Sequence, residues 1–347
     1  MLSHGPPTRI ARRTALGVVI ALALLIAACG DDGDGTDTSL TVYTGRSEEL
    51  VGPLIEEFEA ESCIDVAARY GDSADLALLI DTEGDQSPAD VFLSQSPGAT
   101  GFLDGQGRLT VLSDEILDEV PPALRSPDGT WVGITGRVRV VVYNTDTVSA
   151  DELPDSVFDL TDPTYKGRVG IAPANGSFQD FVTIMRASEG DDATLAWLTA
   201  MNDNDVRLYA KNSAIVEATQ RGEVDFGLVN HYYNERSRAE QGDIGSENHF
   251  VVAGDPGGAV LVTAAGIVDT SERDANATRF IEFLLSESSQ RFFASETLEF
   301  PIAAGVEPVL DLPPLSEVGT IVVDLDALGG GLEVTRDLIV ESGLEAG

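Results

Sequence analysis

The feature that most constrains the fold of this chain is an alternation of short β-branched runs with longer segments of helical periodicity. Residues 40–43 (LTVY) predict a strand, and the apolar residues between 51 and 58 then recur at the spacing of one buried helical face. Further strands are predicted at 90–94, 138–143, 206–210, 224–229 and 259–264, and further helices at 178–187, 193–201, 215–221 and 278–293. Strands that alternate with helices predict an α/β architecture, in which helices cover the sheets.

The length of the chain and one apolar strand predict two lobes. The 347 residues leave room for two lobes with separate cores. The run VRVVVY at 138–143 is apolar enough to be covered on both faces. We expect the strands near 137–143 and 259–264 to cross between the lobes.

The N-terminal segment predicts export. Three arginines precede an apolar run at 15–28, which has the length of a signal-peptide core and is too short for a membrane span. The run ends in Ile-Ala-Ala-Cys, which resembles the lipobox of bacterial lipoproteins. We therefore predict a lipoprotein signal peptide at 1–28, a lipid on Cys29, an acidic flexible tether at 29–38 and a position on the outer face of the cytoplasmic membrane, or in the periplasm. An ordinary signal peptide followed by a coincidental cysteine is the alternative.

The cysteine count adds one expectation. The sequence contains two cysteines, Cys29 and Cys63. Lipidation of Cys29 would use one of the two thiols, so no intramolecular disulfide is expected.

Composition and missing motifs narrow the function. Lys and Arg total 21 against 59 Asp and Glu, which gives a net charge of −38 and argues against nucleic acid as a partner. The sequence has no P-loop, no G-x-S-x-G elbow and no H-E-x-x-H motif. Beyond the signal peptide only His231 and His249 remain, which argues against a histidine-rich metal site. These absences exclude the enzyme classes that such motifs define.

The most informative segment is the pair Tyr232 and Tyr233. It follows the predicted strand 224–229 and precedes a polar, helix-like run at 234–241. Adjacent side chains diverge less at a strand-to-helix turn than within a strand, so two phenols can converge on one ligand. The alternative is that both rings only pack at a lobe boundary.

Around this pair the chain resembles the ferric-ion-binding proteins of bacterial ABC importers. The supporting segments occur in the family's order: LTVYTGRSEE at 40–49, SPADVF at 87–92, GRVRVVVYNT at 136–145, PANGSF at 173–178, YAKNS at 209–213 and GEVDFGLVNHYY at 222–233. The resemblance implies a two-lobed periplasmic-binding-protein (Venus-flytrap) fold, with mixed sheets, two β-strand crossovers and the ligand between the lobes. We expect the first lobe at 39–136 and 265–305, the second at 137–264, and a C-terminal segment at 306–347 whose placement is not predicted.

In that family an adjacent tyrosine pair carries iron, and this role maps onto Tyr232 and Tyr233. The chemistry agrees, because Fe³⁺ prefers anionic oxygen and a bound cation readily displaces a phenol proton. Three positions depart from the family pattern. Ser47 stands where well-known members have a histidine ligand, Gln95 where they have a glutamate, and Phe178 where other relatives have a third tyrosine.

With two protein ligands, the remaining coordination positions require oxygens from a co-bound anion such as carbonate, phosphate or citrate, together with water. The resemblance places this anion at Asn175, Gly176, Ser177, Asn212, Ser213, Asn230, Gln95 and Ser96. The first three begin a predicted helix, whose free N–H groups favour an anion. Arg46, Arg137, Arg139, Ser47 and His231 are possible further contributors. Helix caps, turns and surface ion pairs are the alternative roles for these residues.

The predicted function is a monomeric solute-binding lipoprotein that captures ferric iron, with an anion or as a chelate, and delivers it to an ABC permease. A metal-free receptor for an anionic organic or phosphorus oxyacid on the same fold is the first alternative. A secreted metal-dependent hydrolase that uses aspartate pairs is the second.

Overall fold

The computed structural model describes residues 38–303, 305–308, 312–315, 318 and 331–344, within a compact unit that spans Asp37–Gly347. The signal peptide, Cys29 and nearly all of the predicted tether lie outside the described residues. No helix in the described ranges has both the length and the apolar character needed to cross a bilayer.

The strands form one mixed sheet that confirms the predicted α/β fold. Their order is β2(Asp65–Tyr70), β1(Ser39–Thr44), β3(Val91–Ser94), β9(Val260–Ile267), β4(Val132–Asn144), β7(Phe226–Asn230), β5(Val169–Ile171) and β6(Arg207–Leu208). β8(Ser246–His249) and β10(Phe300–Pro301) pair with β4 outside this path. The outer pairs β1–β2, β1–β3, β5–β6 and β5–β7 are parallel, whereas the pairs that involve β4 or β9 are antiparallel.

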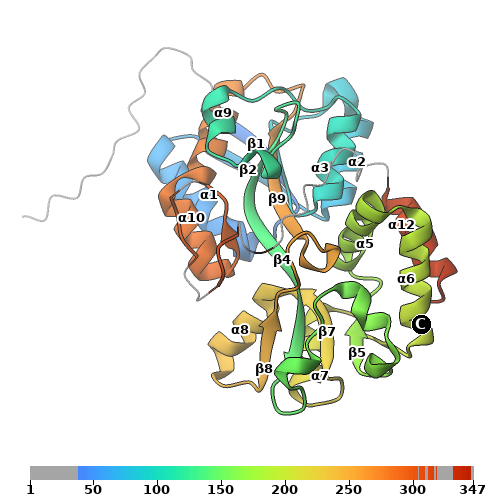
Figure 1. Ribbon diagram of the computed structural model, residues 1–347. Helices are drawn as coiled ribbons and strands as arrows, with labels where there is room; N and C mark the ends of the chain where they lie inside the picture. Colours follow the sequence, from blue (N-terminus) through green and yellow to red (C-terminus); the bar gives the residue numbers. More distant parts are fainter. Residues whose placement is uncertain (1–37, 304, 309–311, 316–317, 319–330, 345–347) are drawn as a thin grey trace, which may run out of the picture. The chain divides into compact units, whose positions relative to one another are not determined.

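Strand β4 joins the two halves of the sheet. Its first part pairs with β9 from Val132 to Val138, and its second part pairs with β7 from Arg139 to Tyr143 (Figure 1). We call β1, β2, β3, β9 and the first part of β4 the first lobe, and β5 to β8 with the second part of β4 the second lobe. The β-branched run predicted at 138–143 therefore lies where the chain passes between the lobes.

Each lobe has its own helices and its own apolar core. The first lobe carries α1(Glu48–Ser62), α2(Ser73–Glu83), α3(Pro97–Gly105), α4(Asp114–Asp118), α9(Asp274–Leu285) and α10(Glu287–Phe292). In its core, Phe58 meets Phe280 edge to face at a centroid distance of 5.1 Å. The second lobe carries α5(Gly176–Glu189), α6(Asp191–Asp203), α7(Asn212–Gln220) and α8(His231–Gln241). Its core is built around Phe178, Phe181 and Trp197.

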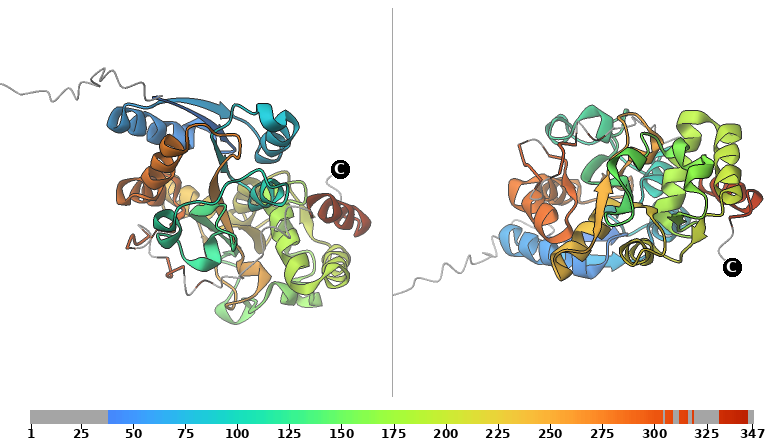
Figure 2. Two further views of the ribbon diagram at one scale, coloured as in Figure 1. Left: turned by 90° about the horizontal axis from the view of Figure 1, so that it is seen from above. Right: turned by 60° about the horizontal axis from the view of Figure 1, so that its bottom comes forward.

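The C-terminal helix α12(Leu332–Glu341) packs on the second lobe. The hydroxyls of Thr335 and Thr183 lie 2.6 Å apart, and Arg186 of α5 donates to Thr335 at 3.0 Å. Leu338 and Ile339 join the core of the second lobe. α12 lies beside α5 and α6 in two views (Figures 1 and 2). The placement of this C-terminal segment is not predicted from the sequence.

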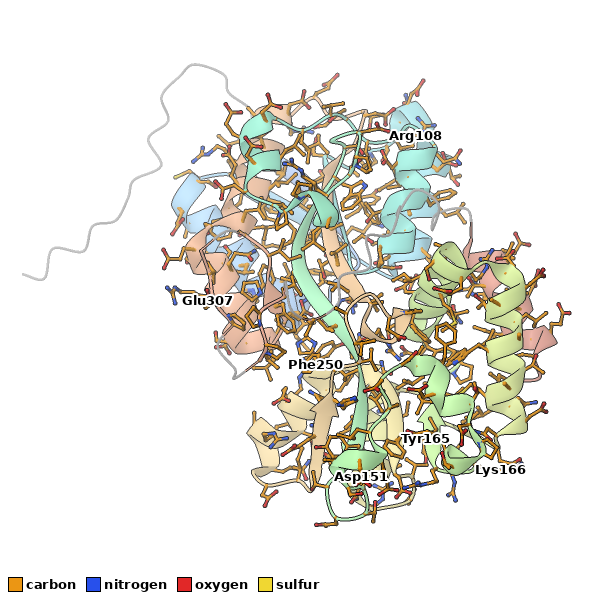
Figure 3. All side chains as sticks on the ribbon, in the orientation of Figure 1. Arg108, Asp151, Tyr165, Lys166, Phe250 and Glu307 are labelled. Atoms are coloured by element: carbon orange, nitrogen blue, oxygen red, sulfur yellow. The ribbon has the colours of Figure 1, made fainter. Side chains whose placement is uncertain are left out.

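Two features at the edges of the first lobe complete the description. Cys63, in the left-handed conformation at the end of α1, is disulfide-bonded. The expectation that the protein has no disulfide is therefore wrong. That expectation depended on a lipid at Cys29. Arg108 follows α3 (Figure 3). It lies 3.4 Å from Asp81 and 3.5 Å from Asp269, and so ties α2 to the chain after β9.

Candidate functional site

A cavity of about 250 Å³ lies where the two lobes face each other. The first lobe lines it with residues that follow its strands: the loop residues Gly45, Asp72, Gln95 and Ser96, and Ser73 at the start of α2. The second lobe contributes Asn175, Gly176, Ser177, Asp180 and Asn230, together with the pair Tyr232 and Tyr233. Arg137 of β4 also lines this cavity.

The two tyrosines lie side by side on the cavity wall. They stand in the first turn of α8, which begins at His231 directly after β7. Their rings stack at a centroid distance of 4.3 Å with an interplanar angle of 29°. The prediction that the two side chains converge at the strand-to-helix turn is therefore confirmed, since the rings point the same way and not to opposite faces.

Burial decides the resting protonation state of Tyr232. Its side chain is 6% exposed. Burial raises the pKa of Tyr232 above its ordinary value, the neighbouring Tyr233 raises it further, and Arg137 lowers it. The phenol is therefore neutral in the apo protein, and a cation that ligates it must displace its proton.

Three buried nitrogens around the cavity lack a hydrogen-bond acceptor among the described residues: Arg137 Nε, Arg139 Nη2 and Asn230 Nδ2. An unpartnered buried polar group typically costs about 1–3 kcal/mol. Both guanidinium groups are almost fully buried, and no described carboxylate lies within ion-pair distance of either. Burial lowers the pKa of Arg139 to about 10, so the group stays charged at neutral pH. These buried, unpartnered donors indicate an anion-binding role for the two arginines. Within the described part of the chain, they do not form the surface ion pairs that were the alternative role.

The N-terminus of α5 forms the wall of the cavity in the second lobe. The Asn175 side chain caps this helix by accepting from the Ser177 N–H at 3.1 Å. Behind it, Asn212 Nδ2 donates to Ser177 Oγ at 2.9 Å. Gly176 leaves the first turn open, because an added Cβ there would meet nothing within 4 Å. Neither Asn212 nor Ser213 lines the cavity; Asn212 supports the residues that do.

Asn230 and Arg139 connect β7 with β4 beside this helix. Arg139 Nη1 donates to Asn230 Oδ1 at 3.0 Å, and it lies 3.4 Å from Ser177 Oγ. This contact turns the amide of Asn230 so that Nδ2 is the atom left for a ligand. Arg139 itself does not line the cavity.

His231 ties the start of α8 to the rest of the protein. Its Nδ1 accepts from the Val138 N–H at 3.1 Å, and its Nε2 lies 2.9 Å from the Leu298 carbonyl oxygen, which can only accept. Burial lowers the pKa of His231 to about 4, so the ring is neutral. Both ring nitrogens are occupied, and therefore His231 supports the tyrosine pair instead of offering a lone pair to a metal.

Two other sequence candidates, Arg46 and Ser47, lie outside the cavity, and so does Phe178, which departs from the family pattern. Arg46 forms a buried ion pair of 2.8 Å with Glu299, so its charge is already compensated. Ser47 is exposed at the start of α1 and does not line the cavity. Phe178 is fully buried, and its ring packs on that of Phe181 at a centroid distance of 5.6 Å. The position at which other relatives have a third tyrosine therefore lies in the core of the second lobe.

Gln95 and Ser96 line the cavity from the loop after β3. The backbone N–H of Gln95 donates to Ser73 Oγ at 3.0 Å, and its carbonyl oxygen accepts from Arg137 Nη2. The Ser96 hydroxyl donates to Asp180 Oδ1 of α5 at 2.9 Å, which links the lobes directly.

Sequence reasoning missed Asp180 and the position of α12. Asp180 is 7% exposed, and burial raises its pKa to about 6. It lies four residues after Gly176 on α5, so helical spacing from the predicted anion site could have found it. Leu332 and Arg336 of α12 also line the cavity, and Arg336 Nε donates to Gln179 Oε1 at 3.1 Å.

The described residues contain no group of three or more His, Cys, Asp or Glu side chains arranged to hold a metal ion. These four residue types alone would therefore not hold a cation in this cavity, and further donors are needed. Phenolate and anion oxygens are such donors.

Comparisons with known proteins agree with this geometry. A model of the bacterial extracellular solute-binding protein family matches residues 86–328. The Fe(3+)-binding periplasmic protein of Serratia marcescens is 31% identical over 338 residues, which cover 96% of this chain and 99% of that protein.

Two solved structures show the same fold. Iron-bound HitA from Pseudomonas aeruginosa is 31% identical with a TM-score of 0.79, over 88% of this chain and 99% of HitA. The IdiA (FutA) protein of Trichodesmium, solved with iron and citrate ligands, is 25% identical with a TM-score of 0.78, over 88% of this chain and 100% of that chain. The Serratia relative is a binding protein by name, and the two solved structures share the two-lobed α/β fold. The chain therefore belongs to the family of bacterial extracellular solute-binding proteins.

Proposed function

We propose that this protein captures a ferric ion together with a small anion between its lobes and delivers it to an ABC permease. One observation carries the proposal: the stacked pair Tyr232 and Tyr233 shares a cavity with the unpartnered donors of Arg137 and Asn230. The pair offers two anionic oxygens once deprotonated, and the donors offer a place for an anion. The names of the relatives support the same cargo.

Charge balance supports an anion as part of the cargo. Two phenolates leave one positive charge of Fe³⁺ uncompensated, and Arg137 and Arg139 add further positive charge nearby. A carbonate, phosphate or citrate group would supply oxygens to the metal and acceptors to the buried nitrogens at once. The Trichodesmium relative, solved with iron and citrate, supports this arrangement.

A metal-free receptor for an oxyanion is the second candidate. The neutral resting state of Tyr232 favours it, because two phenol O–H groups beside buried guanidinium groups can donate to an anion without any metal. The two candidates differ in the protonation of the tyrosines when the ligand is bound.

A spectroscopic titration separates the two candidates. Ferric nitrilotriacetate added to the apo protein should produce a visible phenolate-to-iron charge-transfer band, stronger when carbonate, phosphate or citrate is present. The Tyr232→Phe/Tyr233→Phe double variant should lack the band. No band in wild type, combined with tight binding of the anion alone, would establish the metal-free candidate instead. No step in this scheme needs catalysis, and we propose none.

We propose lobe boundaries close to the predicted ones, with 39–136 and 265–305 in the first lobe and 137–264 in the second. The sheet supports one change, because Val260–Ala264 of β9 pair with the first part of β4 and so belong with the first lobe. The contacts of α12 with α5 support adding the end of the 306–347 segment to the second lobe. Closure of two such lobes on a ligand, and recognition of the closed form by the permease, would couple binding to delivery.

The proposal includes export, a lipid on Cys29 and a monomeric protein at the outer face of the cytoplasmic membrane. The sequence contains only two cysteines, so a lipid on Cys29 and a disulfide at Cys63 exclude each other, and the disulfide argues against the lipid. Mass spectrometry of the mature protein would decide between a diacylglyceryl group on Cys29 and an intact disulfide. Size-exclusion chromatography with light scattering would test the monomer.

A further inference from the structure

The cavity contains one buried carboxylate that the proposed site does not yet use. Two carboxylates line it, Asp72 and Asp180. Asp72 is exposed, and its Oδ1 caps α2 by accepting from the Ala74 N–H at 2.9 Å. Asp180 is 7% exposed and carries its charge inside the cleft.

The hydrogen bonding of Asp180 is incomplete. Oδ1 accepts from the Ser96 hydroxyl at 2.9 Å, and no described residue donates a hydrogen bond to Oδ2. Arg137 and Arg139 both attract the carboxylate, but no described cation lies within ion-pair distance of it. A buried carboxylate without a direct partner is costly unless a cation joins it.

The position of Asp180 relative to an anion points the same way. Asp180 lies four residues after Gly176, in the second turn of the helix whose N-terminus lines the cavity. A carboxylate there repels an anion bound alone at that N-terminus. A cation between the carboxylate and the anion removes this repulsion, because it attracts both.

We propose that Asp180 ligates the bound ferric ion as the third anionic protein oxygen, beside Tyr232 and Tyr233. The inference rests on the proposed function. Three anionic donors balance the three charges of the ion, and the charges of Arg137 and Arg139 then match a dianion such as carbonate or hydrogen phosphate. Coordination replaces or shares the Ser96 hydrogen bond, so the contact that links the lobes in the apo protein becomes part of the filled site.

Asp180→Asn tests this role with little change of shape. The amide keeps an oxygen that accepts from Ser96 but removes the anionic donor. With iron and carbonate bound, we expect the charge-transfer band to move to longer wavelength, because a less neutralised ferric ion draws phenolate electrons at lower energy. We also expect iron affinity to fall by at least about 100-fold, measured by competition with citrate.

Two matched variants separate coordination from other effects. Asp72→Asn removes the same charge from the same cavity, so an equal band shift in this variant would reduce Asp180 to a distant charge and overturn the inference. Ser96→Ala removes only the link between the lobes. If it reproduced both the band shift and the affinity loss of Asp180→Asn, Asp180 would act through Ser96 and the inference would be wrong.

The remaining outcomes separate a failure of the proposed function from a failure of this inference. A wild-type protein without any charge-transfer band overturns the proposed function and this inference with it. A wild-type band that is unchanged in Asp180→Asn overturns the inference alone. If Asp180→Asn does not fold, a crystal structure of the wild-type iron complex replaces it, and an Asp180 oxygen outside coordination distance of the iron is the contradicting result.

Discussion

Iron capture by this cleft should release protons, and the number released reports on Tyr232. A phenol of ordinary pKa ~10 loses its proton at neutral pH at a cost of about 4 kcal/mol, because each pH unit is worth about 1.4 kcal/mol. Burial raises the pKa of Tyr232 further, so this figure is a lower bound for that residue. The metal–oxygen bond must exceed this cost.

The same linkage predicts a steep pH dependence. When two phenols lose protons together on binding, apparent affinity rises about 100-fold per pH unit below the phenol pKa. The direction is fixed, because the free protein holds the protons and the complex does not. Binding therefore strengthens as pH rises, until hydroxide competes for the ferric ion.

Proton release is best measured as a difference between two proteins. In weakly buffered solution with ferric nitrilotriacetate and carbonate, wild type should release one more proton per bound iron than Tyr232→Phe. Contributions from the chelator and the anion are the same in both titrations and cancel. Equal release in the two proteins would refute the claim that Tyr232 binds iron as a phenolate.

Three further predictions concern the surroundings of the site. Asn230→Asp keeps the oxygen that accepts from Arg139 but replaces the unpartnered Nδ2 donor with a carboxylate oxygen. The affinity for iron should therefore fall at least about tenfold and no longer depend on carbonate. Iron titrations with and without carbonate measure both effects. The pKa of His231 is about 4 in the folded protein and about 6.5 in the unfolded chain, so the stabilisation from its neutral ring is complete above pH 6.5 and is lost as the pH falls toward 4. Urea unfolding should show a free energy of unfolding that changes by up to about 3 kcal/mol over this pH range in wild type but not in His231→Asn. Equal pH profiles of the two proteins would contradict this prediction. Ending the chain at residue 330 exposes the second-lobe surface under Leu338 and Ile339, so thermal unfolding should show a loss of about 3 kcal/mol or more, and an unchanged melting temperature would contradict the packing of α12.

Local patterns predicted the geometry that depends on neighbours in sequence, whereas the assignment of iron and an anion to these positions came from the family resemblance. The tyrosine pair was identifiable because a strand-to-helix turn fixes the directions of adjacent side chains. The start of α5 at Asn175–Ser177 was identifiable because a cap and a free helix end are local features. The strand at 138–143 was identifiable because burial on both faces leaves an unbroken apolar run.

The parts that failed depend on contacts between distant residues. Arg46 was a candidate for the anion, but it pairs with Glu299, which lies 253 residues further on. No local pattern indicates such a partner. Asp180 escaped notice among 59 acidic residues, because its burial depends on Ser96 and the other lobe. The position of α12 depends in the same way on Thr183 and Arg186 of α5.

The central claim is that two tyrosine oxygens and a borrowed anion together hold one ferric ion. A crystal structure of the wild-type protein loaded with iron and carbonate, with the metal located by anomalous scattering, tests it most directly. We predict one iron peak in the cavity, bonded to both Tyr232 and Tyr233, with the anion between the metal and the donors of Arg137 and Asn230. An iron peak elsewhere, or an anion in this cavity without a metal, would contradict the claim.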